Sequence, residues 1–336
     1  MSCLPFGTRK GESKVGSSVI CIGELLIDFF CTETDINLME GKKFEKQAGG
    51  APANVCAAIA KLGGKASFCG KVGNDPFGSF LKKTLDEAGV DTSMVVFDPV
   101  HKTSLAFVSL QAGGERDFLF NRGADAFLSE QDIDEEKIKQ AGILHFGSAT
   151  ALLEDPFRTL YFDMMKKAKN EGKFISFDPN FRNDLWKTNT EEFISLAKMA
   201  MGLADFIKMS EDELELISGV NGVTAGLDAL QETCAGLIAV TLGSAGTIVS
   251  NGREKKAVPS ICVKSIDSTG AGDAFVGALL YQIAHSENPK MAAANMDLVT
   301  KMVSFSNRIG AIVCTKVGAV SAMPSLKIVN QEVVSS

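Results

Sequence analysis

Short apolar segments rich in β-branched residues alternate along this chain with segments of helical period, and this alternation is what most constrains its fold. Strands of a parallel sheet are buried on both faces and read as continuous apolar runs, whereas the helices between them carry one apolar stripe. The predicted strands are Val19–Ile22, Ala66–Val72, Ile143–Phe146, Phe174–Phe177, Asp205–Lys208 and Leu237–Leu242. The predicted helices are Pro52–Leu62, Phe77–Ala88, Pro156–Asn170, Glu192–Met201, Gly270–His285 and Met296–Ile309. We therefore expect a three-layer α/β/α core around a mostly parallel, doubly wound sheet.

Two segments, Ile27–Gln47 and Lys102–Asn121, interrupt the alternation and are typical of extended hairpins. Together they predict a small β-sheet outside the main one, formed by residues of about 30–48 and 100–123. We interpret it as a lid over the active site and as a homodimer surface, the alternative being edge strands of the main sheet. No repeat or linker divides the chain, so we expect one domain over 18–330 and a disordered N-terminus over 1–17.

The composition excludes several classes of protein. With 336 residues, a net charge of -7 and a pI near 5.2, the chain has no basic face for nucleic acid or an anionic membrane, and small-molecule ligands are expected. It has no apolar run of membrane-spanning or signal-peptide length, which predicts a cytoplasmic protein. The eight cysteines form no C-x-x-C and are expected to be reduced, and the three histidines are not spaced as a metal pair.

The stretch 267–273, Asp-Ser-Thr-Gly-Ala-Gly-Asp, places two glycines and an acid where a helix is predicted to begin. Backbone N–H groups at a helix start attract an anion, and the Asp273 carboxylate could take a proton from a hydroxyl. This combination favours phosphoryl transfer to an alcohol, although a plain glycine-rich strand-to-helix connection has the same residues. The dinucleotide fingerprint fails because its third glycine would fall at Phe275, and no P-loop motif occurs.

A second glycine-rich stretch, 47–54, precedes the helix predicted from Pro52. Its paired glycines Gly49 and Gly50 allow a ligand to approach the backbone, and Asn54 offers a donor and an acceptor. Upstream, Asp28 follows a strand and could accept hydrogen bonds from sugar hydroxyls. Each of these could equally be an ordinary turn or loop residue; in combination they suit a polyol.

These stretches resemble the signatures of one family. Ala48–Asn54, followed by Gly63, Gly70, Gly73 and Gly78, resembles the N-terminal signature of the ribokinase/PfkB carbohydrate kinases, and 267–273 resembles their C-terminal signature D-x-x-G-A-G-D. The resemblance extends from Val19 to about Leu326 and implies a ribokinase-like fold. Within the family, the segments 49–54, 121–125, 177–182 and 208–211 are most similar to the fructokinases.

The resemblance implies a role for each matching position. Asp273 would be the general base, and the N–H groups of Gly270, Ala271 and Gly272 would stabilise the transferring phosphoryl group. The sugar would be held by Asp28, Gly49, Gly50 and Asn54. Arg122 and Arg182 would contact the substrate or the phosphate, although each could be an ordinary surface arginine.

The nucleotide side is expected at Lys208 and at 241–246, which resembles the loop T-x-G-x-x-G, with Asn307 near the adenine. In that loop Thr241, Gly243 and Gly246 match, and a plain β-turn is the alternative. Glu213 is a candidate for water-mediated Mg²⁺ binding; the family often has N-x-x-E here, whereas this chain has Ser210, which with Glu213 also makes a helix capping box. The resemblance also suggests a K⁺ site at Asp267, Thr269, Val313 and Gly318, although Ala322 stands where some relatives have a hydroxyl.

The sequence thus predicts an ATP-dependent fructokinase that uses Mg²⁺ and makes fructose 6-phosphate. A 2-keto-3-deoxygluconate kinase is the nearest alternative, because its substrate is also phosphorylated at a terminal hydroxyl. A catalytically silent sugar- or nucleotide-binding regulator is the remoter one.

Overall fold

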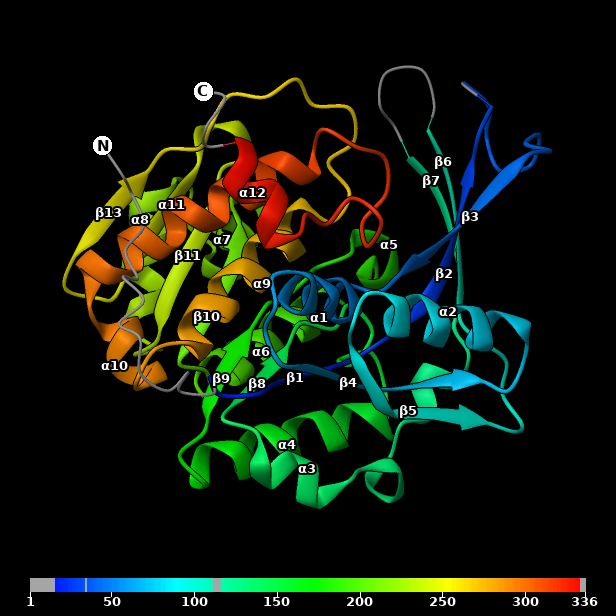
Figure 1. Ribbon diagram of the computed structural model, residues 1–336, viewed down its shortest axis with the longest axis horizontal. Coiled ribbons are helices and arrows are strands. Elements are labelled where there is room, and N and C mark those ends of the chain that lie inside the picture. The colour runs from blue at the N-terminus through cyan, green and yellow to red at the C-terminus, as the bar shows by residue number, and fades with distance from the viewer. Residues whose placement is uncertain (1–15, 34, 111–115, 333–336) are drawn as a thin grey trace.

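A computed structural model describes residues 16–33, 35–110 and 116–332 (Figure 1). Of the predicted N-terminal segment 1–17, positions 1–15 lie outside the described residues, as do positions 111–115 of the predicted hairpin Lys102–Asn121. The strands are β1 (Val19–Ile22), β2 (Leu26–Cys31), β3 (Phe44–Gly49), β4 (Ala66–Gly73), β5 (Asp91–Asp98), β6 (Leu105–Leu110), β7 (Arg116–Asn121), β8 (Ile143–Phe146), β9 (Phe174–Phe177), β10 (Phe206–Ser210), β11 (Leu237–Thr241), β12 (Thr247–Ser250) and β13 (Lys255–Val258). The α-helices are α1 (Ala51–Lys61), α2 (Pro76–Glu87), α3 (Glu135–Gln140), α4 (Phe157–Asn170), α5 (Asn183–Trp186), α6 (Thr190–Met201), α7 (Glu211–Ser218), α8 (Val223–Gln231), α9 (Ala271–Ala284), α10 (Pro289–Ala294), α11 (Met296–Val313) and α12 (Leu326–Glu332).

The main sheet has nine strands in the order β13-β12-β11-β10-β9-β8-β1-β4-β5, and the seven from β11 to β5 run parallel. Successive side chains of a strand point to opposite faces. In β1, Val19 and Cys21 pack with α1, α2, α9, α10 and α11, while Ile20 and Ile22 pack with α3, α4, α6, α7 and α8 on the other face. The predicted three-layer, mostly parallel core is confirmed.

The edges of this sheet contain strands that the sequence did not predict. Along β5 exposed and buried residues alternate over its first half, and its sequence begins and ends with aspartate, so it lacks the apolar run used to find the central strands. β13 begins with two lysines and pairs antiparallel with β12. Edge strands face solvent on one side, so the pattern of a doubly buried strand does not apply to them.

The predicted hairpins form a second sheet in the order β3-β2-β6-β7, which in Figure 1 projects from the main body. β2 pairs antiparallel with β3 and parallel with β6, and β6 pairs antiparallel with β7. The alternative that these are edge strands of the main sheet is wrong. Asp28, Ala106 and Phe120 share one row across it, so the face that carries Asp28 also carries the half-buried Phe118 and Phe120.

The parallel strands direct the chain's polar loops to one edge of the main sheet. Ligands of open α/β sheets bind outside the carboxyl ends of the strands. The segments that follow β1, β8, β9, β10 and β11 therefore meet at this edge, where the second sheet also leaves the body.

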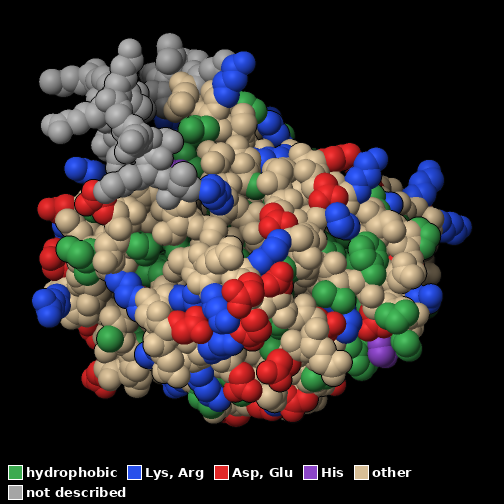
Figure 2. All heavy atoms as spheres, turned by 60° about the horizontal axis from the view of Figure 1, so that its bottom comes forward, with side chains coloured by type: hydrophobic (Ala, Val, Ile, Leu, Met, Phe, Trp, Pro, Cys, Tyr) green, Lys and Arg blue, Asp and Glu red, His purple; other side chains and the backbone are tan. Residues whose placement is uncertain are grey.

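The exterior carries charges of both signs. On the face shown in Figure 2, basic and acidic side chains are interspersed and hydrophobic ones are scattered. Within the described ranges no helix has the length and apolar character needed to cross a membrane.

Candidate active site

The turn before α9 has the geometry that the sequence predicted for an anion-binding helix start. Gly270 is the N-cap residue with φ 76°, a left-handed conformation that favours glycine, and a Cβ there would lie 2.7 Å from the Cβ of Ala319. The Gly270 carbonyl accepts the Ala274 N–H at 2.8 Å, and the Ala271 N–H donates to Ser268 O at 3.2 Å. The remaining N–H groups of the first turn have no intrahelical acceptor and are available to an anion.

Asp273 lies in the first turn of α9 among residues that are distant in the sequence. The Asn54 Nδ2 donates to Asp273 Oδ2 at 2.8 Å. Burial raises the pKa of Asp273, and the Asn54 hydrogen bond and the nearby Lys208 ammonium partly offset this effect. A carboxylate with a raised pKa is a stronger base than an ordinary aspartate, as proton abstraction from an alcohol requires.

Lys208 is buried beside this carboxylate and forms an ion pair with Asp178, with Nζ 3.0 Å from Oδ2. A Cβ on Gly272 would lie 3.2 Å from the same Nζ, so the lysine also borders the α9 turn. Burial lowers the pKa of Lys208, but Asp178, Glu213 and Asp273 together raise it above its ordinary value. The ammonium therefore stays charged at the predicted phosphoryl site.

Asp28 and the paired glycines form the second part of the site. Gly49 pairs with Leu26, and a Cβ on Gly49 would lie 1.9 Å from Asp28 Oδ2. Gly50 has φ 108°, and its Cβ would lie 2.4 Å from Glu24 O. Burial raises the pKa of Asp28 to about 7, and Arg182 partly offsets the shift. Glycine is thus required at both positions for the backbone to approach the carboxylate and the strand end.

The two candidate arginines have different surroundings. Arg122 donates to Glu154 Oε1 at 2.9 Å and to Thr150 O at 2.8 Å, and its Nε lies 3.4 Å from Asp125 Oδ2. Arg182 is exposed, and its positive charge lowers the pKa of both the Asp28 and the Asp273 carboxyl against the raising effect of burial. Of the two arginines, Arg182 is the one whose charge acts on both parts of the site.

Glu213 makes the predicted capping box at the start of α7. The Ser210 Oγ accepts the Glu213 N–H at 3.2 Å, and Glu213 Oε2 accepts the Ser210 N–H at 2.7 Å. The other oxygen, Oε1, accepts the Phe181 N–H at 2.8 Å. The carboxylate therefore joins the loop after β9 to the loop after β10.

The predicted nucleotide residues lie at the hairpin between β11 and β12. Gly246 has φ 103°, and its Cβ would lie 2.2 Å from Val258 O. The Thr241 Oγ1 donates to Met209 O at 3.3 Å, and Gly243 begins a short 3-10 helix with φ 56°. Asn307 accepts from Thr247 Oγ1 at 2.6 Å and donates to Val258 O at 2.9 Å, so its side chain joins α11 to β12 and β13.

The residues suggested for K⁺ surround the entry to the α9 turn. Asp267 Oδ1 accepts from Thr269 N at 2.9 Å and from Thr269 Oγ1 at 2.6 Å, and Asp267 Oδ2 accepts from Gly318 N at 2.9 Å. The Val313 carbonyl accepts from Lys316 N at 3.1 Å. These bonds bring Asp267, Thr269 and Gly318 together before Gly270, whereas the Val313 bond is local to the end of α11.

Comparison with known proteins agrees with this geometry. The model of the pfkB family of carbohydrate kinases matches residues 17–326. The chain belongs to this family. It is 40% identical to fructokinase-1 of Oryza sativa subsp. japonica over 310 residues, which cover 91% of this chain and 94% of that protein.

Solved structures of other carbohydrate kinases share the fold. A fructokinase from Vibrio cholerae O395 with fructose, ADP and calcium bound has a TM-score of 0.84 at 36% identity and covers 95% of this chain and 99% of its own. A double mutant of that enzyme was solved with fructose, ADP and potassium. A fructokinase from Xylella fastidiosa with bound ATP has a TM-score of 0.86 at 33% identity and covers 95% and 98% of the two chains.

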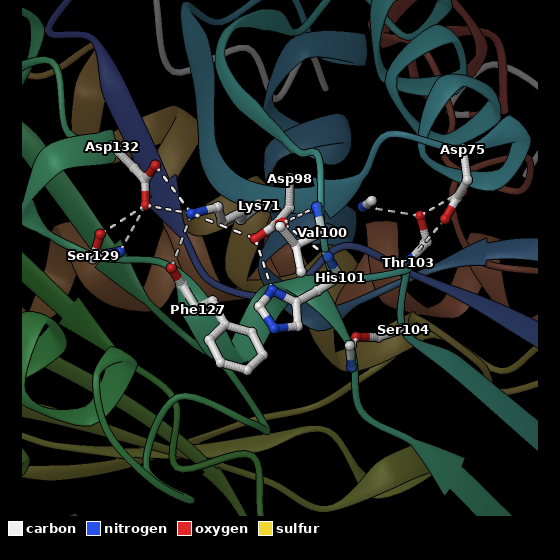
Figure 3. A network of polar contacts seen from close by, with 12 residues as sticks. Lys71, Asp75, Asp98, Val100, His101, Thr103, Ser104, Phe127, Ser129 and Asp132 are labelled. Carbon is white, nitrogen blue, oxygen red and sulfur yellow. Dashed lines mark hydrogen bonds and ion pairs between the residues drawn. The ribbon is translucent and has the colours of Figure 1, made fainter.

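This carbohydrate kinase has a polar network at the base of the second sheet (Figure 3). The sequence analysis did not predict it. Lys71 Nζ lies 2.9 Å from Asp132 Oδ2 and 3.7 Å from Asp98 Oδ2. Asp98 Oδ2 lies 3.2 Å from His101 Nδ1, and the His101 ring stacks on Phe127 at 3.5 Å. The network holds the connection from β5 toward β6.

The same connection is fixed by hydroxyl side chains. Asp75, the N-cap residue of α2, accepts from Thr103 N at 2.9 Å and from Thr103 Oγ1 at 2.8 Å. The Gly123 N–H donates to Ser104 Oγ at 2.7 Å, and Ser104 Oγ in turn donates to the buried Asp125. Both ends of the β6–β7 hairpin are therefore attached to the main body.

A further buried acid, Glu24, lies against the start of α1, and the sequence analysis did not assign it a role. Glu24 accepts from Ala51 N at 3.2 Å and from the Ser148 hydroxyl, and burial raises its pKa to about 7. Its signal in the sequence was an acid shortly after the apolar strand Val19–Ile22.

Proposed function

We propose that this kinase transfers the γ-phosphoryl group of ATP to the terminal hydroxyl of D-fructose, giving fructose 6-phosphate and ADP. The observation that carries the proposal is the pair formed by Asp273 and Asn54. Within the described part of the chain Asn54 Oδ1 is buried and has no hydrogen-bond partner, while Nδ2 is bonded to the Asp273 carboxylate. Buried polar atoms are rarely left unpaired, so Oδ1 is suited to a substrate hydroxyl beside the base.

The chemistry follows from these positions. The fructose hydroxyl gives its proton to Asp273, its oxygen forms the bond to the γ-phosphorus, and the bond from that phosphorus to the bridging oxygen of ADP breaks. The N–H groups of the α9 start, with Gly270, Ala271 and Gly272 in the turn, would stabilise the charge that develops on the transferring group. Asp28, Gly49 and Gly50 would hold the other sugar hydroxyls, and 241–246 with Asn307 and Lys208 would hold the nucleotide.

Magnesium would arrive with ATP, since Mg²⁺ in kinases is bound mainly by phosphates, water and one or two carboxylates. Among the described residues there is no cluster of three or more histidine, cysteine or acidic side chains suited to a metal. A K⁺ ion at Asp267, Thr269, Val313 and Gly318 is part of the proposal, supported by the potassium-bound form of the Vibrio cholerae fructokinase.

The second sheet is proposed as the lid of a single domain over 18–330. Its Asp28 face carries Phe118 and Phe120, which would cover a sugar bound at Asp28. We propose a homodimer through this sheet, where Leu119 is 52% exposed, and light scattering would show a dimer mass. A cytoplasmic location is proposed because the cysteines in the described ranges are free thiols.

The alternative substrate 2-keto-3-deoxygluconate carries a carboxylate and would need a further cation. Arg182 could supply it, but Arg122 is engaged by Glu154 and Asp125, which favours a neutral sugar. A coupled assay for ADP would compare kcat/KM over fructose, tagatose, ribose, 2-keto-3-deoxygluconate and nucleosides. We expect fructose to have the highest value. A higher value for 2-keto-3-deoxygluconate would overturn the substrate, and sugar binding without turnover would favour the silent regulator.

A further inference from the structure

The Glu213 carboxylate is bonded through both oxygens to backbone N–H groups of two different segments, the loop after β9 and the junction of β10 with α7. Oε1 accepts from Phe181 N at 2.8 Å and Oε2 accepts from Ser210 N at 2.7 Å, and the residue is 7% exposed. Hydrogen bonds to an ionised carboxylate are roughly twice as strong as neutral ones, which makes this a firm connection. The Oε2 bond to Ser210 belongs to the capping box of α7. The Oε1 bond to Phe181 connects the carboxylate to the loop after β9.

That loop, residues 178–182, is also fixed from its opposite side. Asn180 has φ 48°, a left-handed conformation that asparagine tolerates better than most other non-glycine residues. Its Nδ2 donates to Gly147 O at 2.9 Å, and its N–H donates to Asp178 Oδ1 at 3.1 Å. The loop is therefore held between the end of β8 and the start of α7.

The residue that this loop presents is Arg182. Phe181 directly precedes it, and the Phe181 ring packs on Phe193 at 4.8 Å between ring centroids. The Arg182 Nη1 donates to the Phe181 carbonyl at 3.1 Å, and the guanidinium acts electrostatically on both Asp28 and Asp273. Displacement of the Phe181 backbone would move Arg182, an exposed charge that acts on both Asp28 and Asp273.

We propose that Glu213 is a positioning residue that holds the 178–182 loop so that Arg182 faces the sugar and the transferring group, and that it is not a ligand of Mg²⁺ through water. The inference rests on the proposed function, since it assigns Arg182 to the sugar kinase site. Both Glu213 oxygens are already directed at N–H groups, which is the geometry of a backbone clamp. Each oxygen keeps a second lone pair, so the Mg²⁺ dependence measured in the test below separates the two roles.

The test compares Glu213→Gln with Ser210→Ala, its matched control. The glutamine has one acceptor oxygen and cannot bond both N–H groups, whereas Ser210→Ala removes only the helix cap and keeps the Phe181 bond. For each variant we would measure KM for the sugar, the dissociation constant of the sugar by calorimetry, and the Mg²⁺ concentration that gives half the maximal rate. We expect Glu213→Gln to weaken sugar binding and raise its KM about tenfold or more, as misplaced groups commonly do, with the Mg²⁺ requirement within about twofold. Ser210→Ala should leave all three within about twofold, because a lost cap costs only about 1 kcal/mol of folding stability.

A double mutant separates action through Arg182 from a general structural effect. Where Glu213 acts through Arg182, the change Glu213→Gln should add little in an Arg182→Ala background, since coupled residues are not additive. Fully additive effects would contradict the proposal, as would a raised Mg²⁺ requirement with an unchanged sugar KM. Asn180→Ala loosens the same loop from its other side and should reproduce the sugar effect, which keeps the test decisive if Glu213→Gln does not fold. All variants are measured with whichever sugar the wild type phosphorylates. An error in the proposed substrate therefore shows in the wild-type assay, whereas an error in the role of Glu213 shows only in the comparison of the variants.

Discussion

Replacement of Gly49 by alanine tests directly whether the close approach of the backbone to Asp28 serves sugar binding. Gly49 ends β3, and its φ is not in the left-handed region, so the backbone itself accepts alanine. The new Cβ would lie 1.9 Å from Asp28 Oδ2, whereas real Cβ contacts essentially never fall below 3.0 Å. The carboxylate or the strand must therefore move by about 1 Å.

A displacement of about 1 Å in a positioned group costs roughly a hundredfold in rate, or about 2.7 kcal/mol. We therefore expect Gly49→Ala to lower kcat/KM for fructose by about a hundredfold, mainly through KM, while KM for ATP changes little. A coupled assay for ADP at saturating ATP measures this, and thermal unfolding reports separately on stability.

The matched control is Gly202→Ala at the end of α6. Its Cβ would meet nothing closer than Met199 O at 3.5 Å, and its φ of -63° is ordinary for alanine. The control should keep wild-type kinetics. A Gly49→Ala enzyme with a kcat/KM for fructose within about threefold of wild type would refute the reasoning that ties this glycine to the position of Asp28.

Two further predictions concern the ends of the site. Burial raises the pKa of Asp28 to about 7, so the carboxyl group that we propose as a sugar ligand is protonated below that pH and ionised above it. KM for fructose should be constant above pH 7 and rise about tenfold per pH unit below it. Asp28→Asn should remove this pH dependence. A pH dependence that persists in the variant would point to Glu24 as the titrating group. At the nucleotide loop, Gly246→Ala places a Cβ 2.2 Å from Val258 O at φ 103° and should raise KM for ATP about tenfold without affecting fructose affinity. Gly252→Ala, at φ 81° but no closer than 3.5 Å to Gln231, is its control, and an equal effect of both would contradict the assignment.

Local patterns in the sequence agree with local structure. The capping box at Ser210 and Glu213 forms as expected, and Gly270 and Gly50 have a positive φ that glycine adopts readily. Central strands were found because burial on both faces leaves a continuous apolar run. The edge strand β5 was missed because its exposed positions break that run.

The sequence did not predict hydrogen bonds between residues that lie far apart along the chain. Asn54 and Asp273 are 219 residues apart, and Ser148 and Glu24 are 124 residues apart. No local pattern records which buried acid meets which donor, since that depends on how the helices and strands pack. For the same reason the sequence could not show that Arg122 is engaged by Glu154 and Asp125 whereas the charge of Arg182 acts on Asp273.

The most direct test of the account is the comparison of Asp273→Asn with the wild type on fructose, with single-turnover rates and sugar dissociation constants measured together. Asparagine keeps the shape of the side chain but cannot accept the proton, and a general base contributes about 10²- to 10⁴-fold to such rates. We predict a loss of that size in the rate of fructose 6-phosphate formation, with sugar affinity within about threefold of wild type. An Asp273→Asn enzyme that forms fructose 6-phosphate at the wild-type rate would contradict the account.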